Sequence, residues 1–300
     1  MKFGVSFNKL PKTIASLLGT VIGIAGIFYL IDFLGRVDFL GHIRGLDASK
    51  VLTISLLIGV FALANSLIAV GWRWIIKDFG GELSLARANL IFCQSNLLKY
   101  VPGNILHIAG QQVLAMRAGV PGLITAKSIT MEMILLVVTS ASFAANLWLA
   151  TRYTADSFLI SAMILPIFFA FVLLILKHLG YPGSAKAALA FCLYHFVGGA
   201  TFSSLFFVLG TVPDRTWFFT FSASYIASWI LGLITPGAPA GLGVREASLI
   251  ALLQGSVTDQ PALAAAVVLV RGMTITSDGL YFLVVRFFSM KESKTCAKKG

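Results

Sequence analysis

Long apolar runs separated by short polar segments dominate the chain. A helix needs about 20 apolar residues to cross the roughly 30 Å hydrocarbon core of a bilayer, and eight runs approach that length. We predict membrane spans near residues 13–32, 51–72, 125–150, 158–176, 187–210, 216–235, 242–256 and 261–288. The pattern predicts an all-α polytopic membrane protein with a single integral membrane domain over 1–290 and a short basic cytoplasmic tail over 291–300.

Two shorter apolar segments, 84–98 and 104–118, differ from these spans. About 15 residues rise only about 22 Å, which is too little to cross the core. We therefore predict a re-entrant helical hairpin. A Pro-Gly pair breaks the helix at its tip, in the motif Lys99-Tyr100-Val101-Pro102-Gly103-Asn104.

Polar residues continue beyond this tip. Asn104, His107 and Gln111 are spaced three and four apart, so they share one helical face. Such groups commonly bridge neighbouring membrane helices, and that remains one interpretation. Bridging between helices does not explain Lys99 as easily, because a charged lysine at the tip of the hairpin must snorkel, face a cavity or bind an anion.

A second break separates the runs that end near 235 and begin near 242. It reads Thr-Pro-Gly-Ala-Pro-Ala-Gly-Leu-Gly-Val-Arg-Glu over 235–246. Its prolines and glycines interrupt a helix; they are Pro236, Gly237, Pro239, Gly241 and Gly243. A helix that restarts here would place unpaired N–H groups at membrane depth, where they favour an anion. Paired interrupted helices in two halves are typical of transporters built from inverted repeats.

Composition supports the membrane interpretation. The chain is 58% hydrophobic and 12% charged, with a mean hydropathy of +0.90, which leaves too few charged residues for the surface of a soluble protein. The net charge of +11 is spread over the ends of apolar runs. This distribution indicates membrane topology and argues against nucleic-acid binding.

With a cytoplasmic N-terminus, the basic residues divide unequally between the two sides. The predicted inner side holds Lys2, Lys9, Lys12, Arg73, Lys77, Arg87, Arg117, Lys127, Lys177, Lys186, Arg245, Arg286, Lys291, Lys294, Lys298 and Lys299. The outer side holds Arg36, Arg44, Lys50, Arg152 and Arg215. This bias predicts a multi-pass protein of the plasma (inner) membrane with both termini in the cytoplasm. If 242–256 were a half-helix, the tail would be expected outside.

Neither the N-terminal segment nor the cysteines indicate a functional site. Lysines precede the first run and no small-residue cleavage site follows it, which indicates a signal anchor. Cys93, Cys192 and Cys296 lie far apart, so neither a disulfide framework nor a metal site is predicted. We expect no cofactor.

Charged residues inside the spans are the remaining candidates for a site. One helical face carries Ser128, Glu132, Thr139 and Ser142, and another carries Arg271, Thr274, Asp278 and Tyr281. Each such charge is unfavourable by at least about 2.5 kcal/mol at the centre of a span. Arg271 could pair with Asp278 or Glu132, or contact substrate. Glu246 is explained simply by its place in a helix's first turn, where the dipole favours an acid.

The two motifs, with His107 and Arg271, resemble the transmembrane region of lysylphosphatidylglycerol synthases and related stand-alone flippase-like membrane proteins. The resemblance rests on residues 99–104 and 236–247. It implies a flippase that moves a lipid with a polar headgroup along broken helices. The best-known members carry a soluble aminoacyl-transferase domain after this region, whereas this sequence ends at Gly300. The resemblance therefore favours other lipids, such as a polyprenyl-phosphate-linked glycolipid or a modified phospholipid with an anionic or phosphate-containing headgroup.

Other function classes remain open. The chain has no His-Glu-x-x-His, no Gly-x-Ser-x-Gly and no aspartate-rich cluster, so no enzyme mechanism is indicated. An intramembrane enzyme or accessory subunit of a lipid-modifying or glycosyl-transfer pathway is the main alternative, and a membrane scaffold or a homo-oligomer also remains open.

The expected mechanism places two half-helices, which begin near Gly103 and Gly241, around one anionic headgroup at mid-membrane. The predicted substrate-binding residues are Lys99, Pro102, Gly103, Asn104, His107, Gln111, Glu132, Pro236, Gly237, Gly241, Gly243, Arg245, Glu246, Arg271 and Asp278.

Overall fold

The computed structural model describes residues 10–101, 106–152, 155–210, 217–235 and 237–297, with side chains over somewhat narrower ranges. Every element in these ranges is helical. The elements are α1 (Leu10–Arg36), α2 (Phe39–Arg44), α3 (Ala48–Asp78), α4 (Leu85–Leu97), η1 (Leu98–Tyr100), α5 (Leu106–Arg117), α6 (Gly122–Arg152), α7 (Ala155–His178), α8 (Pro182–Leu209), α9 (Trp217–Ile234), η2 (Pro239–Gly241), α10 (Val244–Leu253) and α11 (Gln260–Ala297). The all-α prediction is confirmed for this part of the chain.

Five helices among the described residues are long and apolar enough to cross a bilayer. They are α3, the segment Gly122–Leu149 of α6, α8, α9 and the segment Gln260–Met290 of α11. The chain is thus a multi-pass membrane protein. Two other predicted spans, 13–32 and 158–176, fall within α1 and α7, whose side chains are described only in part.

The predicted crossing at 242–256 does not match the structure. Helix α10 has 10 residues, which rise about 15 Å and cover about half of the hydrocarbon core. The helix begins at Val244, two residues later than predicted, because the backbones of Leu242 and Gly243 are not helical. This segment is a half-helix by length.

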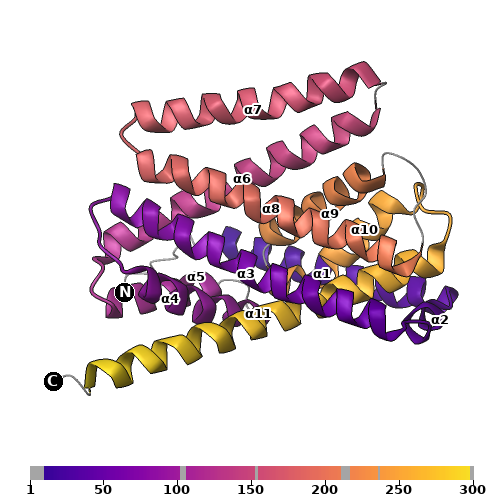
Figure 1. Cartoon of the computed structure of the whole chain (residues 1–300), viewed down its shortest axis with the longest axis horizontal. Coiled ribbons are helices and arrows are strands. Elements are labelled where there is room, and N and C mark those ends of the chain that lie inside the picture. The colour runs from indigo at the N-terminus through magenta and orange to yellow at the C-terminus, as the bar shows by residue number, and fades with distance from the viewer. Residues whose placement is uncertain (1–9, 102–105, 153–154, 211–216, 236, 298–300) are drawn as a thin grey trace, which may run out of the picture.

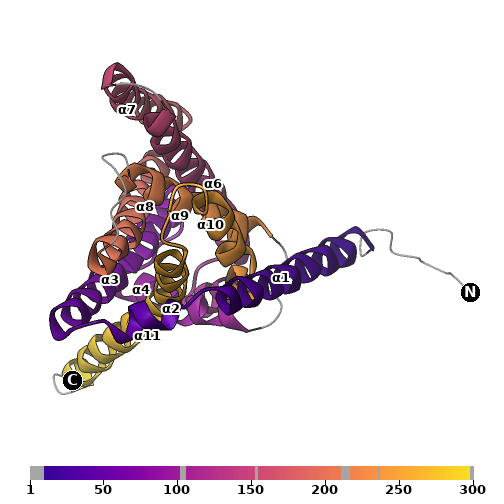
Figure 2. The same ribbon diagram turned by 90° about the vertical axis from the view of Figure 1, so that its right-hand side faces the viewer.

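The long helices lie roughly side by side along the long axis of the molecule (Figure 1). Helices α3 and α8 pack closely along their lengths, and α6, α9 and α11 pack around them. Helix α7 packs on α6 and α8 at one edge, whereas α1 leans away from the bundle and packs on α10 (Figure 2). Small residues permit the closest approaches. At Gly71 of α3, a methyl group would lie 2.5 Å from the ring of the fully buried Phe191 on α8.

Two helical hairpins meet inside this bundle. The first is α4–η1–α5 and the second is α9–η2–α10; in each, the two helices pack against one another. The first extends inward from the end where α11 finishes, and α10 lies nearer the opposite end (Figure 1). Their turns touch, because η1 packs against η2. The two helix breaks of the sequence are thereby brought together.

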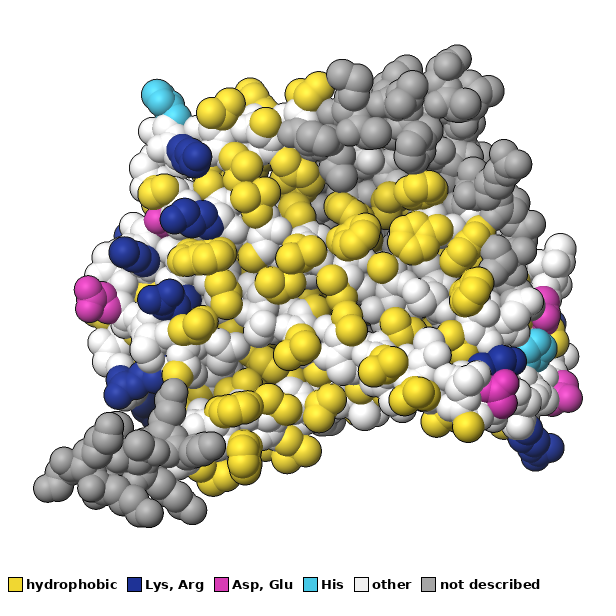
Figure 3. Space-filling model, viewed as in Figure 1, with side chains coloured by type: hydrophobic (Ala, Val, Ile, Leu, Met, Phe, Trp, Pro, Cys, Tyr) yellow, Lys and Arg dark blue, Asp and Glu magenta, His cyan; other side chains and the backbone are white. Residues whose placement is uncertain are grey.

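The surface has the distribution expected of a membrane protein. Large apolar side chains are exposed on the outside of the helices, among them Leu63, Phe171 and Phe207, each more than 60% accessible. Figure 3 shows hydrophobic side chains across the middle of one face, while charged side chains gather at its two ends. In water such a surface would be unfavourable, whereas lipid accommodates it.

Candidate functional site

The turn between α9 and α10 has a backbone that few sequences can adopt. Gly237, Gly241 and Gly243 have φ values of 92°, 68° and 81°, and Ala240 is the one described non-glycine residue with positive φ, at 50°. Positive φ is unfavourable for residues with a Cβ. Gly241 also lies against Gly232 of α9, where a Cβ would come 2.7 Å from the Gly232 Cα. The glycines of this motif therefore bring the α9–α10 turn into the bundle.

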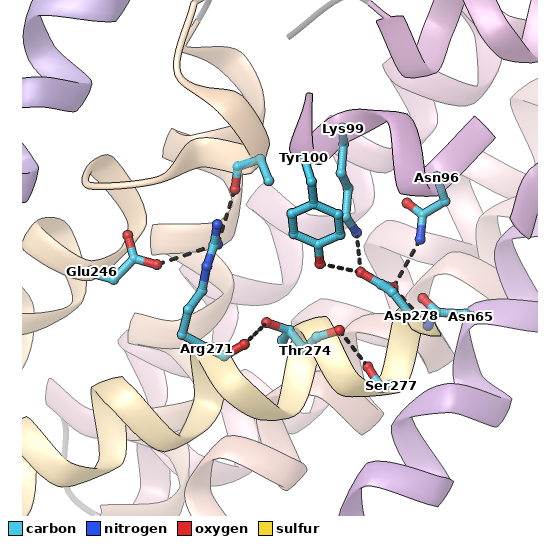
Figure 4. Close-up of polar contacts among 10 residues, drawn as sticks. Asn65, Asn96, Lys99, Tyr100, Glu246, Arg271, Thr274, Ser277 and Asp278 are labelled. Carbon is cyan, nitrogen blue, oxygen red and sulfur yellow. Dashed lines mark hydrogen bonds and ion pairs between the residues drawn. The ribbon is translucent and has the colours of Figure 1, made fainter. Parts of the chain in front are cut away.

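Asp278 of α11 is the centre of one polar cluster (Figure 4). Its Oδ2 pairs with Lys99 Nζ at 2.7 Å and accepts a hydrogen bond from the Tyr100 hydroxyl, both from η1. Its Oδ1 accepts from Asn65 Nδ2 at 3.2 Å and Asn96 Nδ2 at 2.9 Å. The carboxylate is 2% exposed, and four donors from three elements stabilise it. This cluster fastens the first hairpin to α11.

Arg271, two turns earlier on α11, joins the same helix to the second hairpin. Its Nη1 lies 3.4 Å from Glu246 Oε1 and donates to the Ala240 carbonyl at 3.2 Å. Its Nε and Nη2 are buried and have no hydrogen-bond partner. Buried polar groups are normally satisfied, so these two donors indicate a place for a ligand or ordered water. Figure 4 shows the guanidinium on the side of Tyr100 that faces the second hairpin.

Glu246 has a structural role besides this ion pair. Its Oε2 accepts a hydrogen bond from Gly243 N at 2.8 Å, so it caps the helix that it begins. The prediction that a first-turn acid serves the helix N-terminus is confirmed. The Glu246 carboxylate thus contacts both the α9–α10 turn and Arg271 and fixes their relative positions.

A second buried carboxyl lies on α6. Glu132 is fully buried, and its Oε2 accepts from Gln111 Nε2 of α5 at 2.8 Å. Its Oε1 has no hydrogen-bond partner. Glu132 and Gln111 both line the same cavity as Lys99 and Arg271. Of the predicted polar face, His107 and Gln111 therefore point into the cavity, whereas Asn104 lies outside the described residues.

This cavity has a volume of about 100 Å³ and lies between the two hairpins, α6 and α11. Cationic side chains line it from three elements: Lys99, Arg245 and Arg271. The Arg245 guanidinium stacks over the Tyr225 ring, 5.8 Å from its centroid, and forms no ion pair with any described carboxylate. Lys99 and Arg271 are paired with Asp278 and Glu246, so Arg245 is the cation at the cavity that has no ion pair among the described carboxylates.

Most of the predicted site residues come together here. Lys99, His107, Gln111, Glu132, Gly241, Arg245 and Arg271 line the cavity. Asp278 and Glu246 reach it through their ion pairs, and Gly237 and Gly243 shape the turn. Pro102, Gly103, Asn104 and Pro236 lie outside the described residues.

The expected ion pairing requires correction. One of the two alternatives for Arg271 was pairing with Asp278 or Glu132, but Arg271 pairs with Glu246, and Asp278 pairs with Lys99. Sequence spacing shows which residues share a helical face, whereas the partner is set by which hairpin tip lies opposite. Asn65 and Asn96 were missed as site residues. An isolated amide in the apolar run 51–72 was the available signal for Asn65.

Comparison of the chain with protein-family models, curated protein sequences and solved structures finds no match. No group of three or more metal-ligating side chains occurs among the described residues. The functional argument therefore rests on the geometry of the cavity.

Proposed function

We propose that this protein is a flippase, which moves a lipid with an anionic or phosphate-containing headgroup between the leaflets of the plasma (inner) membrane. The observation that carries the proposal is the cavity between the two hairpin turns, where three cationic side chains converge and two Arg271 donors are unpaired. An anionic headgroup is too unfavourable in hydrocarbon to cross unaided. Only the headgroup needs this polar path, because the acyl chains can remain in lipid.

The pairing of elements supports an inverted repeat. We divide the chain into α1, α3, α4–α5 and α6, followed by α7, α8, α9–α10 and α11. In this division α3 packs on α8, and η1 packs on η2. The hairpin helix α4 packs on α11 of the other half, just as α9 packs on α6. Such reciprocal pairing is expected when two halves enclose a shared central site.

We propose that both hairpins are re-entrant and enter from opposite sides; α9 is long enough to cross by itself, but in this proposal it ends at the η2 turn, which packs against η1 inside the bundle. The chain then crosses the membrane fully with α1, α3, α6, α7, α8 and α11 in place of the eight predicted spans. A half-helix α10 no longer conflicts with a cytoplasmic tail, because α9 and α10 together return the chain to the side from which they entered. The excess of basic residues in the inner loops supports cytoplasmic termini.

The cavity volume implies a closed state. About 100 Å³ is well below the roughly 300–1,000 Å³ of typical ligand sites. Loading a headgroup therefore requires the hairpin turns to separate, and the Lys99–Asp278 and Arg271–Glu246 pairs connect each turn to α11. We infer that alternating opening of the two turns gives access from the two leaflets.

The resemblance to the transmembrane region of lysylphosphatidylglycerol synthases and stand-alone flippase-like proteins supports the same substrate class. Its two motifs are the segments that form the facing turns. We propose a glycolipid on a polyprenyl phosphate, or a modified phospholipid, as the lipid carried.

The test is transport by purified protein in vesicles. A headgroup-labelled anionic lipid is followed to the opposite leaflet for the native protein and for Arg271→Gln. We expect this substitution to reduce the rate at least about tenfold, because a buried charge-assisted contact to an anion contributes about 1.5–3 kcal/mol. Arg286→Gln is the matched control, since Arg286 is exposed on the same helix. Native rates equal to those of protein-free vesicles, across several anionic lipids, would contradict the flippase proposal.

A further inference from the structure

A second and larger hollow lies at one end of the bundle, away from the central cavity. It is bounded by the end of α3, the α3–α4 loop, the start of α4 and the start of α8. Its volume is about 880 Å³, within the range of ligand sites. The α3–α4 and α7–α8 loops lie at the left-hand end of Figure 1, and Figure 3 shows Lys and Arg side chains gathered at that end.

The charges around this hollow, which we call the end pocket, are unbalanced. Four basic side chains line it: Arg73, Lys77, Arg87 and Lys186. Two acids also line it, Asp78 and Glu82, so the formal sum is four minus two, or +2. The positive end of α4 adds to this potential, because α4 begins at the pocket, whereas the N-terminus of α8 is already occupied by Asp78.

Asp78 contributes little free negative charge to the pocket. Its Oδ1 accepts from Gly183 N at 2.8 Å, and its Oδ2 accepts from both the amide and the hydroxyl of Ser184. The carboxylate is therefore occupied in capping α8. Glu82 is the remaining acid, and it is exposed on the loop. The four cations thus have a single uncommitted counter-charge.

The wall of the end pocket is fixed by packing. Arg73 Nε donates to the Leu83 carbonyl at 2.8 Å, which orients the guanidinium and leaves its Nη groups available. Gly183 packs directly on the Trp74 carbonyl, with no room for a Cβ. Trp74 lines the pocket beside Arg73, and tryptophan next to basic residues is typical of the headgroup region of a membrane. These contacts fix the wall of the pocket at one end of the apolar bundle.

We propose that the end pocket binds a phosphate-bearing group with two or more negative charges, separately from the transported headgroup. Lys and Arg side chains together with helix N-termini are the usual ligands of phosphate. Membrane topology alone could explain basic residues at this end. If topology were the whole explanation, the pocket cations would contribute no more to phosphate binding than other basic residues at the same end. The two contributions can be compared by measuring binding.

The experiment compares two triple variants of the full chain with the same change in charge. The pocket variant is Lys77→Gln/Arg87→Gln/Lys186→Gln. The control variant is Arg117→Gln/Lys127→Gln/Lys177→Gln, at exposed positions outside the pocket near the same end of the bundle. Binding is measured by two probes: phosphatidic acid in neutral nanodiscs, by native mass spectrometry, and inorganic pyrophosphate, by calorimetry in detergent.

We expect the pocket variant to bind at least one probe about tenfold more weakly than native protein, and the control variant to stay within about twofold. Loss of phosphatidic acid binding alone identifies a lipid headgroup as the ligand, and loss of pyrophosphate binding alone identifies a soluble phosphate compound. Equal losses in both variants would mean that diffuse surface charge is responsible. Equal losses, or no loss in either variant, would overturn the proposal.

A single substitution guards against misfolding of the triple variant. Glu82→Gln removes the uncommitted acid at an exposed loop position, so we expect phosphate binding to tighten severalfold. Unchanged or weaker binding in this variant would also overturn the proposal. The substituted residues do not line the central cavity, so any lipid bound there is common to native protein and all variants, and the comparison between them reports on the end pocket alone.

Discussion

The two ionic clusters on α11 differ in what they leave available. Asp278 is saturated by four donors and is therefore a structural anchor for the first hairpin. Arg271 uses one nitrogen for Glu246 and Ala240 and leaves Nε and Nη2 unpaired. Asp278 thus has little capacity left for a ligand, whereas Arg271 keeps two hydrogen-bond donors for one. For this reason we expect removal of the Asp278 charge to lower stability and removal of the Arg271 charge to lower transport.

The first prediction at this scale concerns stability. Asp278→Asn leaves Lys99, which is 25% exposed, without its counter-charge, and breaking such a buried pair destabilises a protein by about 3–5 kcal/mol. We expect a lower thermal midpoint in detergent. Adding Lys99→Met should recover part of the loss, because the unpaired charge is gone.

Asp32→Asn provides the control for Asp278→Asn. Asp32 pairs with Arg36 at 2.9 Å, but both side chains are more than half exposed. Such exposed pairs contribute about 0–1 kcal/mol, so the thermal midpoint should hardly move. A similar small shift for Asp278→Asn would show that the anchor is not energetically important.

At the scale of elements, the contact between α1 and α10 depends on glycine. Gly23 and Gly26 of α1 face Gly243 at the start of α10, and a Cβ on Gly26 or Gly243 would overlap the backbone opposite. Because α1 packs on the bundle mainly through α10, this contact also sets how far α1 lies from the central cavity. Close packing of small residues is a common way to join membrane helices.

We expect Gly243→Ala to separate these helices. Its φ of 81° adds about 1–2 kcal/mol of strain for a residue with a Cβ, and overpacking adds about 1–3 kcal/mol. A loss of about 2–5 kcal/mol should appear as a lower thermal midpoint and faster proteolysis of the α1–α2 region. Gly59→Ala is the control, since that position in α3 is open and helical, and it should be neutral or stabilising. Equal effects of the two substitutions would contradict the packing argument.

At the scale of the whole molecule, an apolar middle separates two charged ends (Figure 3). The connections at one end include Glu82 and Leu179, and those at the other include Ser256 and Arg44, the last residue of the short helix α2. Membrane insertion must therefore put these two pairs of positions in different compartments. The basic residues predict that the end with Glu82 faces the cytoplasm.

Single cysteines at these four positions, in a background without the native cysteines, test this orientation. A membrane-impermeant thiol reagent applied to intact cells should label Arg44→Cys and Ser256→Cys. Glu82→Cys and Leu179→Cys should react only after permeabilisation. Labelling of Ser256→Cys and Leu179→Cys from the same side would contradict the proposed path of the chain.

The sequence by itself determined much of this protein. Local composition settled the all-helical membrane class, since long apolar runs require lipid and backbone groups in lipid require helices. The Pro and Gly positions located both helix breaks, because proline and positive φ act within a few residues. The charged residues that line the cavity were found because the bilayer makes an isolated charge unfavourable wherever it occurs.

Only the tertiary structure decided how these parts meet. It brought η1 against η2, paired Lys99 with Asp278 and Arg271 with Glu246, and recruited Asn65 and Asn96 to the cluster. It also showed that 242–256 contains a half-helix, since hydropathy measures apolarity but not where a helix stops. The physical reason is the distance along the chain. Periodicity reports the face of a single helix, whereas the partners of Asp278 lie up to 213 residues away in the sequence and approach it only through packing.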